Sequence, residues 1–173
     1  MKNIYNLFLT ALLVAGLIGC EDYDLADQDI ELEELPGYVA FDAPGEEAYL
    51  DDEEVTEEDG SVALRIEVPT GSLSDVNVTY TFSGTAVFGT DFTVEGASAS
   101  GGSTTIVIDK AEFNDTDGVD IDITLLTDGV ADGDKTLSIT LESAQNTDGL
   151  SFAVGRGGTE LLKTANVIIT DID

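Results

Sequence analysis

From residue 38 onward, apolar and polar residues alternate with a period of two along much of the chain. This alternation is typical of β-strands that bury one face, and clusters of Gly, Asp, Ser and Pro separate the runs as turns. The apolar positions of the clearest runs are Val62, Leu64, Ile66 and Val68; Val76, Val78, Tyr80 and Phe82; Ile121, Ile123 and Leu125; and Leu137, Ile139 and Leu141. A further run covers residues 165–170. The pattern predicts an all-β fold, a single antiparallel β-sandwich of about seven strands over residues 38–173.

The predicted core has to be built from aliphatic residues and phenylalanine, because the chain has no Trp and only 7% aromatic residues. We expect Phe41, Phe82, Phe92 and Phe113 to be its large side chains. The longest stretch without alternation runs from residue 143 to residue 163 and contains four glycines. We expect this stretch to be unstructured and to be the best candidate contact surface.

The first twenty residues have the features of a secretory signal. Lys2 precedes an apolar stretch over residues 7–19, which is too short to span a bilayer. The following sequence, Leu17-Ile18-Gly19-Cys20, resembles the bacterial lipobox, in which the Cys at the cleavage point becomes the acylated N-terminus. Cys20 is the only cysteine of the chain, and lipidation would account for it. We therefore predict a signal peptide over residues 1–19 and attachment to the membrane through a lipid on Cys20.

An acidic segment follows the predicted cleavage point. Residues 20–37 carry eight Asp and Glu residues and no basic residue, so they are expected to form a disordered, self-repelling tether. Acidic residues directly after a lipidated Cys resemble the surface-export signals of Bacteroidetes lipoproteins. This resemblance implies an outer-membrane lipoprotein that faces the cell surface. The alternative is that the segment is a spacer and carries no export signal.

Composition excludes several classes of function. The chain has 36 Asp plus Glu against 6 Lys plus Arg, a formal net charge of −30, so nucleic acid is a poor partner. It has no His and one Cys, which excludes His-dependent nucleophilic catalysis, His-ligated zinc and an intrachain disulfide.

The acidic residues gather in the predicted loops and at the ends of the predicted strands. The groups are Glu57, Glu58 and Asp59; Asp91; Asp128, Asp132 and Asp134; and Asp171 and Asp173. Carboxylates brought together at one end of a sandwich repel each other unless a cation lies among them, and calcium prefers six to eight such oxygen ligands. The pattern by itself is compatible with a calcium site, but a merely solvated acidic surface explains it equally well.

Three motifs resemble the Calx-beta family. The first is Gly84-Thr85-Ala86-Val87-Phe88-Gly89-Thr90-Asp91-Phe92, the second covers residues 127–137, and the third is the closing strand that runs into residues 171–173. The resemblance implies an immunoglobulin-like sandwich, some members of which bind calcium between loops at one end. It also implies ligand roles for Glu57, Asp91, Asp128, Asp132, Asp171 and Asp173.

The chain departs from the family pattern at three positions. Thr127 and Ile172 stand where the family often has Asp, and Lys135 stands where it often has Glu. Two anionic ligands are lost and an ammonium is gained, which argues for one calcium ion or a degenerate site rather than a cluster of ions. If Asp128, Asp132, Asp171 and Asp173 converge near Lys135, we expect its ammonium to relieve their repulsion, and a solvated lysine at the edge of a strand is the alternative.

These features favour a non-enzymatic, calcium-binding adhesion or interaction module with an unidentified protein or glycan ligand. The alternative is an accessory lipoprotein that binds a surface polysaccharide for a nutrient-uptake system, although the absence of Trp counts against it. A hydrolase that uses a carboxylate pair is a third hypothesis, and the small size of the domain counts against it.

Overall fold

The computed structural model describes residues 37–43, 49–110, 116–127 and 129–172. All of them lie in the compact unit Glu34–Asp173, one of two units into which the chain divides. Several predictions lie outside the described residues: the signal peptide, lipidated Cys20, nearly all of the tether, and the positions of Phe113, Asp128 and Asp173. Among the residues that are described, no helix is long and apolar enough to cross a membrane.

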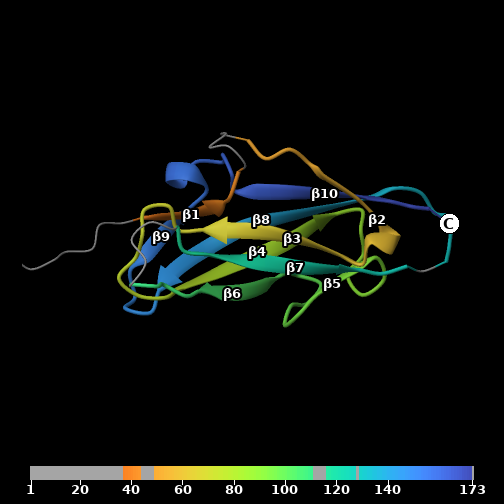
Figure 1. The fold of residues 1–173 in the computed structure, drawn as a ribbon. Coiled ribbons are helices and arrows are strands. Elements are labelled where there is room, and N and C mark those ends of the chain that lie inside the picture. The colour runs from red at the N-terminus through yellow and green to blue at the C-terminus, as the bar shows by residue number, and fades with distance from the viewer. Residues whose placement is uncertain (1–36, 44–48, 111–115, 128, 173) are drawn as a thin grey trace, which may run out of the picture. The chain divides into compact units, whose positions relative to one another are not determined.

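Ten β-strands make up most of the described chain (Figure 1). They are β1 (Tyr38–Phe41), β2 (Glu53–Thr56), β3 (Ser61–Glu67), β4 (Val76–Gly84), β5 (Phe92–Val94), β6 (Gly102–Ile106), β7 (Gly118–Leu125), β8 (Lys135–Asn146), β9 (Ser151–Val154) and β10 (Thr164–Thr170). Two short 3-10 turns, η3 (Glu57–Asp59) and η4 (Arg156–Gly158), complete the elements. The five predicted runs are β3, β4, β7, β8 and β10, and the prediction of an all-β fold is confirmed.

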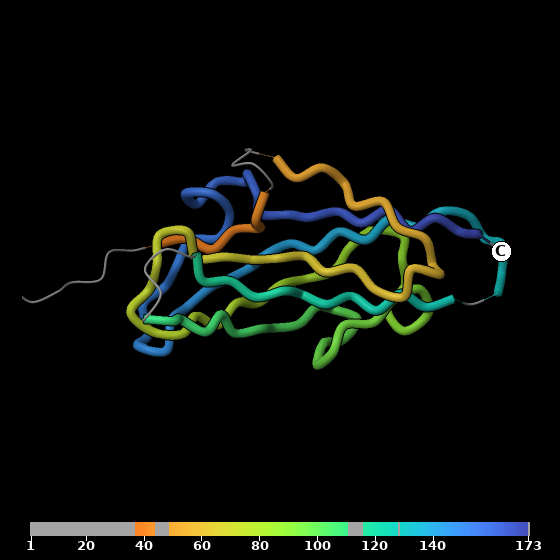
Figure 2. The backbone as a smooth tube through the Cα atoms, in the orientation of Figure 1, coloured from red at the N-terminus to blue at the C-terminus, as the bar shows by residue number. Residues whose placement is uncertain are grey.

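The strands form the two layers of a sandwich. One layer has the order β1-β3-β7-β5, and the other has the order β6-β4-β8-β10-β2. Strand β9 pairs with both β8 and β1, so hydrogen bonding continues from one layer to the other. Most pairs are antiparallel, and the exceptions are β1 with β9 and β2 with β10. Figure 2 follows the chain through the two layers.

The core lies between the layers and contains the apolar positions that alternation predicts. Ile66, Val78, Ile123, Ile139 and Val167 are completely buried, one from each of the five predicted strands. Tyr80 is buried as well. Of the expected large side chains, Phe41 and Phe92 are buried, and Phe82 is partly buried against the same core.

The prediction for residues 143–163 is wrong. Strand β8 continues to Asn146, and β9 and η4 occupy much of the remainder. Asn146 is buried and closes the β8–β9 turn, because its side-chain oxygen accepts a hydrogen bond from the Leu150 backbone N–H at 2.8 Å. Residues 143–146 and 151–154 are thus part of the sheet, and the contact surface expected from a loose loop loses its basis.

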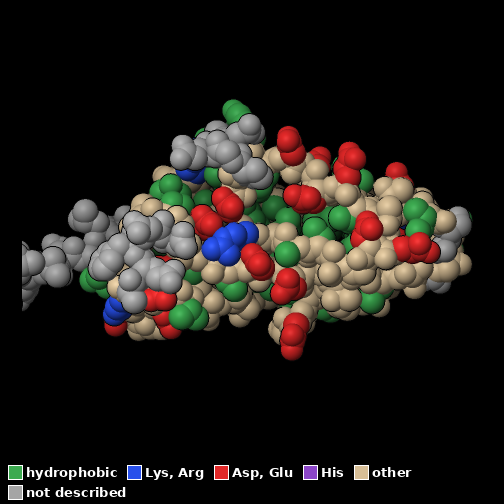
Figure 3. Space-filling view, viewed as in Figure 1, with side chains coloured by type: hydrophobic (Ala, Val, Ile, Leu, Met, Phe, Trp, Pro, Cys, Tyr) green, Lys and Arg blue, Asp and Glu red, His purple; other side chains and the backbone are tan. Residues whose placement is uncertain are grey.

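The surface of the sandwich is acidic along its length. Figure 3 shows Asp and Glu side chains spread over the visible face and few Lys or Arg side chains between them. On this face, acidic side chains are therefore not confined to the loops at one end of the sandwich.

Candidate functional site

Four segments meet at one end of the sandwich (Figures 1 and 2): the β2–β3 turn, the β4–β5 loop, the β7–β8 connection and the residues after β10. Backbone hydrogen bonds join the first two segments to the third. The Leu125 N–H donates to the Gly60 carbonyl at 3.0 Å, and the Leu126 N–H donates to the Asp91 carbonyl at 2.9 Å. We call this region the acidic end, and it comprises Glu57, Asp59, Asp91, Asp132, Asp134, Lys135 and Asp171.

The β4–β5 loop is positioned by a close crossing of Gly84 and Thr136. Gly84 has a φ of +116°, and a Cβ atom at this position would overlap the Thr136 carbonyl oxygen. That oxygen accepts hydrogen bonds from the backbone N–H groups of Thr85 (2.8 Å) and Ala86 (2.9 Å), and the Thr85 hydroxyl accepts one from the Thr136 N–H at 2.8 Å. The Gly84-Thr85-Ala86 motif thus ties the loop to the start of β8.

Asp91 closes this loop from within. One of its carboxylate oxygens accepts a hydrogen bond from the Val87 N–H at 2.5 Å, and its own N–H donates to the Val87 carbonyl at 2.9 Å. Only 3% of Asp91 is exposed. The aromatic rings of Phe82, Phe88 and Phe92 pack together beside it, with centroids 5.2 to 5.9 Å apart. This packing holds the ends of the loop in place, so the Asp91 carboxylate has a fixed position.

The β2–β3 turn carries Glu57 and Asp59. Asp59 accepts hydrogen bonds from the Thr56 N–H at 2.6 Å and from the Thr56 hydroxyl at 3.0 Å. These hydrogen bonds lower the pKa of the Asp59 carboxyl below its ordinary value. Glu57 follows Thr56 and is 3% exposed. A buried carboxylate at this turn agrees with the prediction that Glu57 belongs to the same end as Asp91.

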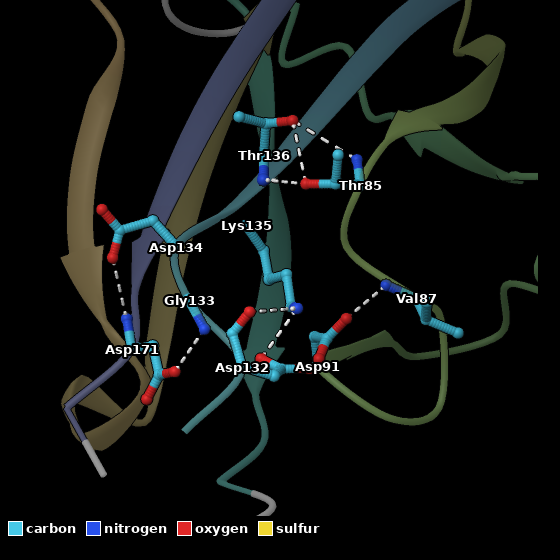
Figure 4. Close-up of polar contacts among 9 residues, drawn as sticks. All are labelled: Thr85, Val87, Asp91, Asp132, Gly133, Asp134, Lys135, Thr136 and Asp171. Carbon is cyan, nitrogen blue, oxygen red and sulfur yellow. Dashed lines mark hydrogen bonds and ion pairs between the residues drawn. The ribbon is translucent and has the colours of Figure 1, made fainter. Parts of the chain in front are cut away.

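The β7–β8 connection and the residues after β10 hold each other (Figure 4). An oxygen of Asp171 accepts a hydrogen bond from the Gly133 N–H at 2.6 Å. In return, the Asp171 N–H donates to a side-chain oxygen of Asp134 at 3.3 Å. Asp134 was not among the predicted ligands, and its role as an acceptor depends on a backbone conformation that the sequence does not specify.

Lys135 is the basic group of the acidic end. Its ammonium lies 2.7 Å from a carboxylate oxygen of Asp132 and 3.5 Å from the Asp132 carbonyl oxygen. The hydrogen bond to Asp132 raises the pKa of the Lys135 ammonium, partial burial opposes the rise, and the charges of Asp132, Asp91 and Asp171 add to it. Asp132 and Asp171 are two of the four acids expected around Lys135, and Asp91 is an addition that the sequence did not indicate.

The structure brings four of the six predicted ligands to one end: Glu57, Asp91, Asp132 and Asp171. Asp128 and Asp173 lie outside the described residues. Carboxylate oxygens are the right type of donor for calcium, but calcium takes six to eight of them. Within the described ranges, no group of three or more acidic side chains is close enough together to hold a metal ion. The donor chemistry fits calcium, whereas the described donors do not form a complete cage.

Comparison with known proteins bears on the fold. No protein-family model matches the sequence, and no curated protein matches it. Among solved structures, the chain is similar to the apo form of the Calx CBD1 domain, with a TM-score of 0.53 and 22% identity over 79% of this chain and 97% of that chain. It is also similar to the Calx CBD2 domain, with a TM-score of 0.51 and 19% identity over 78% of this chain and 86% of that chain. A third similar structure is CBD12 from CALX1.2, with a TM-score of 0.53 and 21% identity over 79% of this chain and 44% of that chain.

The strand order, the buried core and these similarities define an immunoglobulin-like β-sandwich. More narrowly, the fold is Calx-beta-like.

Proposed function

We propose that this chain is a non-enzymatic interaction or adhesion module, attached to a bacterial outer membrane by a lipid on Cys20 and displayed at the cell surface. The observation that carries the proposal is the Calx-beta-like sandwich, which matches the Calx CBD1 domain over 79% of the chain. The lipobox-like Leu17-Ile18-Gly19-Cys20 supports the lipid anchor, and the acidic segment that follows it supports export to the cell surface.

The anchor is tested in a bacterial host. The mature wild-type protein should begin at Cys20 and partition into the detergent phase. The Cys20→Ala variant should accumulate either uncleaved or in the aqueous phase. Protease added to intact cells should remove the domain of the wild-type protein. A mature chain that begins elsewhere would contradict the anchor, and protection of the domain in intact cells would contradict surface display.

We also propose that the acidic end binds one calcium ion weakly. Asp91, Asp132 and Asp171 would supply carboxylate oxygens, and Glu57, Asp128 and Asp173 are the further ligands that the family resemblance implies. The support is the meeting of the four described acids at the end of the sandwich where the family motifs place a site.

Calcium binding to the folded state alone should raise the melting temperature. Extracellular modules bind calcium at about 10⁻⁴–10⁻³ M, and a tenfold excess over the Kd stabilises by about 1.4 kcal/mol. For a domain of this size the melting temperature should therefore rise by about 3–6 °C in millimolar calcium and fall again in chelator. Asp91→Asn should abolish the rise, and magnesium at equal ionic strength is the control. Identical melting curves in calcium and in chelator would overturn this part of the proposal.

A further inference from the structure

The position of Lys135 has a consequence for the calcium-free protein. We propose that Lys135 is the internal counter-cation of the acidic end: its ammonium stabilises the domain without a metal, and calcium has to compete with it for Asp132. The first part stands on the geometry alone. The second part rests on the calcium binding proposed above.

The ammonium lies among the carboxylates that a bound cation would have to neutralise. Its contacts are the Asp132 carboxylate at 2.7 Å and the Asp132 carbonyl at 3.5 Å. Figure 4 shows the Lys135 side chain directed toward Asp132 and Asp91, with Asp171 on the other side of Asp132. Only 17% of the Lys135 side chain is exposed, which is little for a lysine, and its charge is therefore less screened by water than that of a surface lysine.

The carboxylates around Lys135 are fixed in place. Asp91 is held by the Val87 N–H, and Asp171 is held by the Gly133 N–H. Either side chain would lose a hydrogen bond if it turned away from its acidic neighbours. The loops thus hold these carboxylates in positions where they repel each other. A nearby positive charge offsets this repulsion.

Lys135 itself is fixed by its strand. It is the first residue of β8 and pairs with Ile169 of β10, while Thr136 beside it is bonded to Thr85. The backbone below the ammonium is therefore held from both sides. A flexible surface lysine would reach a carboxylate only part of the time, whereas this one starts from a defined position.

Lys163 offers a matched control. It forms an ion pair of the same i,i+3 spacing with Glu160, at 3.2 Å, and its side chain is 24% exposed. Glu160 is 88% exposed, so this pair is an ordinary surface ion pair of small net effect. Replacing each lysine by methionine removes the charge and keeps most of the aliphatic length.

The first arm measures melting temperatures in chelator. Lys135→Met should lower the melting temperature by about 3 °C or more, while Lys163→Met should change it by about 1 °C or less. Lys135→Arg should stay near the wild type. Asp171→Asn, which keeps an acceptor for the Gly133 N–H, should destabilise the wild type or leave it unchanged and should stabilise Lys135→Met. A stabilisation by Asp171→Asn that occurs only in the Lys135→Met background separates a counter-cation from a simple pair between Lys135 and Asp132. Equal shifts for the two methionine variants, or no such stabilisation by Asp171→Asn, would overturn the proposal.

The second arm titrates calcium into the same variants. Lys135→Met should bind calcium at least about tenfold more tightly than the wild type, because Asp132 is released and the opposing charge is gone. A response in Lys135→Met without one in the wild type would support the competition and contradict calcium binding by the natural protein. Equal calcium affinity in both would overturn the competition, and the result in chelator would still decide the role of Lys135 as counter-cation.

Discussion

Single carboxylates set the conformation of the loops at the acidic end by accepting hydrogen bonds from nearby N–H groups. Asp91 does so for Val87, Asp171 for Gly133 and Asp59 for Thr56. In each case the charged oxygen replaces a backbone acceptor that the turn does not provide, and a hydrogen bond to a charged group is stronger than a neutral one. The conformation of these loops therefore depends on a few side-chain acceptors.

Asp59 gives a prediction about pH. Its pKa is lowered in the folded protein by the hydrogen bonds from Thr56, so its stabilising contribution is present above the unfolded value of 3.8 and is lost as the pH falls through the lower folded value. The Asp59→Ala variant should be less stable than the wild type at pH 7, and the difference should shrink below pH of about 4. Urea unfolding at pH 7 and pH 3 measures it.

Glu58→Ala is the control for this experiment, because Glu58 is an exposed acid on the same turn. It should change stability little at either pH. A stability difference between Asp59→Ala and wild type that is the same at both pH values would show that the ionised carboxylate has no special role.

At the level of elements, alternation found the strands that cross the core and missed the short ones. Strands β4, β7, β8 and β10 each place at least three buried apolar residues on one face, and β3 buries Leu64 and Ile66. Strand β2 has no fully buried residue, and β6 has only Ile106. Such strands form because a neighbouring strand offers free hydrogen-bonding groups, and this depends on the assembled sheet rather than on the local sequence.

The candidate site was predictable to a similar extent. The places of the acidic residues at strand ends indicated only that several acids could meet at one end. The resemblance to the Calx-beta family implied the set that includes Glu57, Asp91, Asp132 and Asp171, and the position of Lys135 at this site. The sequence did not indicate which carboxylate oxygens are taken by Val87 and Gly133, because these bonds depend on the φ and ψ angles of the loops. The ligand roles of the acids remain a prediction.

The end of β4 provides a test at this scale. Gly84→Ala should destabilise the domain strongly, because the new Cβ meets the Thr136 carbonyl oxygen in addition to the strain of a positive φ. Gly89→Ala is the matched control: Gly89 also has a positive φ, but the space around it is open. It should cost about 1–2 kcal/mol, and Gly84→Ala clearly more, in chemical denaturation. Equal costs would mean that the crossing with Thr136 is loose.

For the whole molecule, the dominant quantity is the net charge of −30. Acidic side chains are spread over the visible face of the sandwich rather than confined to the acidic end (Figure 3). Folding brings these negative charges closer together than they are in the unfolded chain, and their repulsion destabilises the folded state. Neutralisation by Lys135 acts at one end only, and the remaining repulsion is distributed over the surface.

Monovalent salt should therefore stabilise the protein. Between about 0.01 M and 1 M the Debye length falls from about 30 Å to about 3 Å, so the melting temperature should rise over this range. Sodium chloride is the suitable salt, because sulfate also strengthens apolar burial. Potassium chloride should give the same curve, since the effect is one of screening. A melting temperature that stays flat or falls with chloride would contradict a destabilising surface charge.

The place of β10 between β8 and β2 also sets an order of events for a growing chain. Among the described strands, β2 pairs only with β10, and more than a hundred residues separate the two. Strand β2 therefore lacks this partner until residues 164–170 have emerged. Pairings of such long sequence separation are slow to form. The acidic end is completed later still, since Asp171 follows β10. A chain that is translocated from its N-terminus would therefore remain open until its last strand arrives, and the site would be assembled only at the destination.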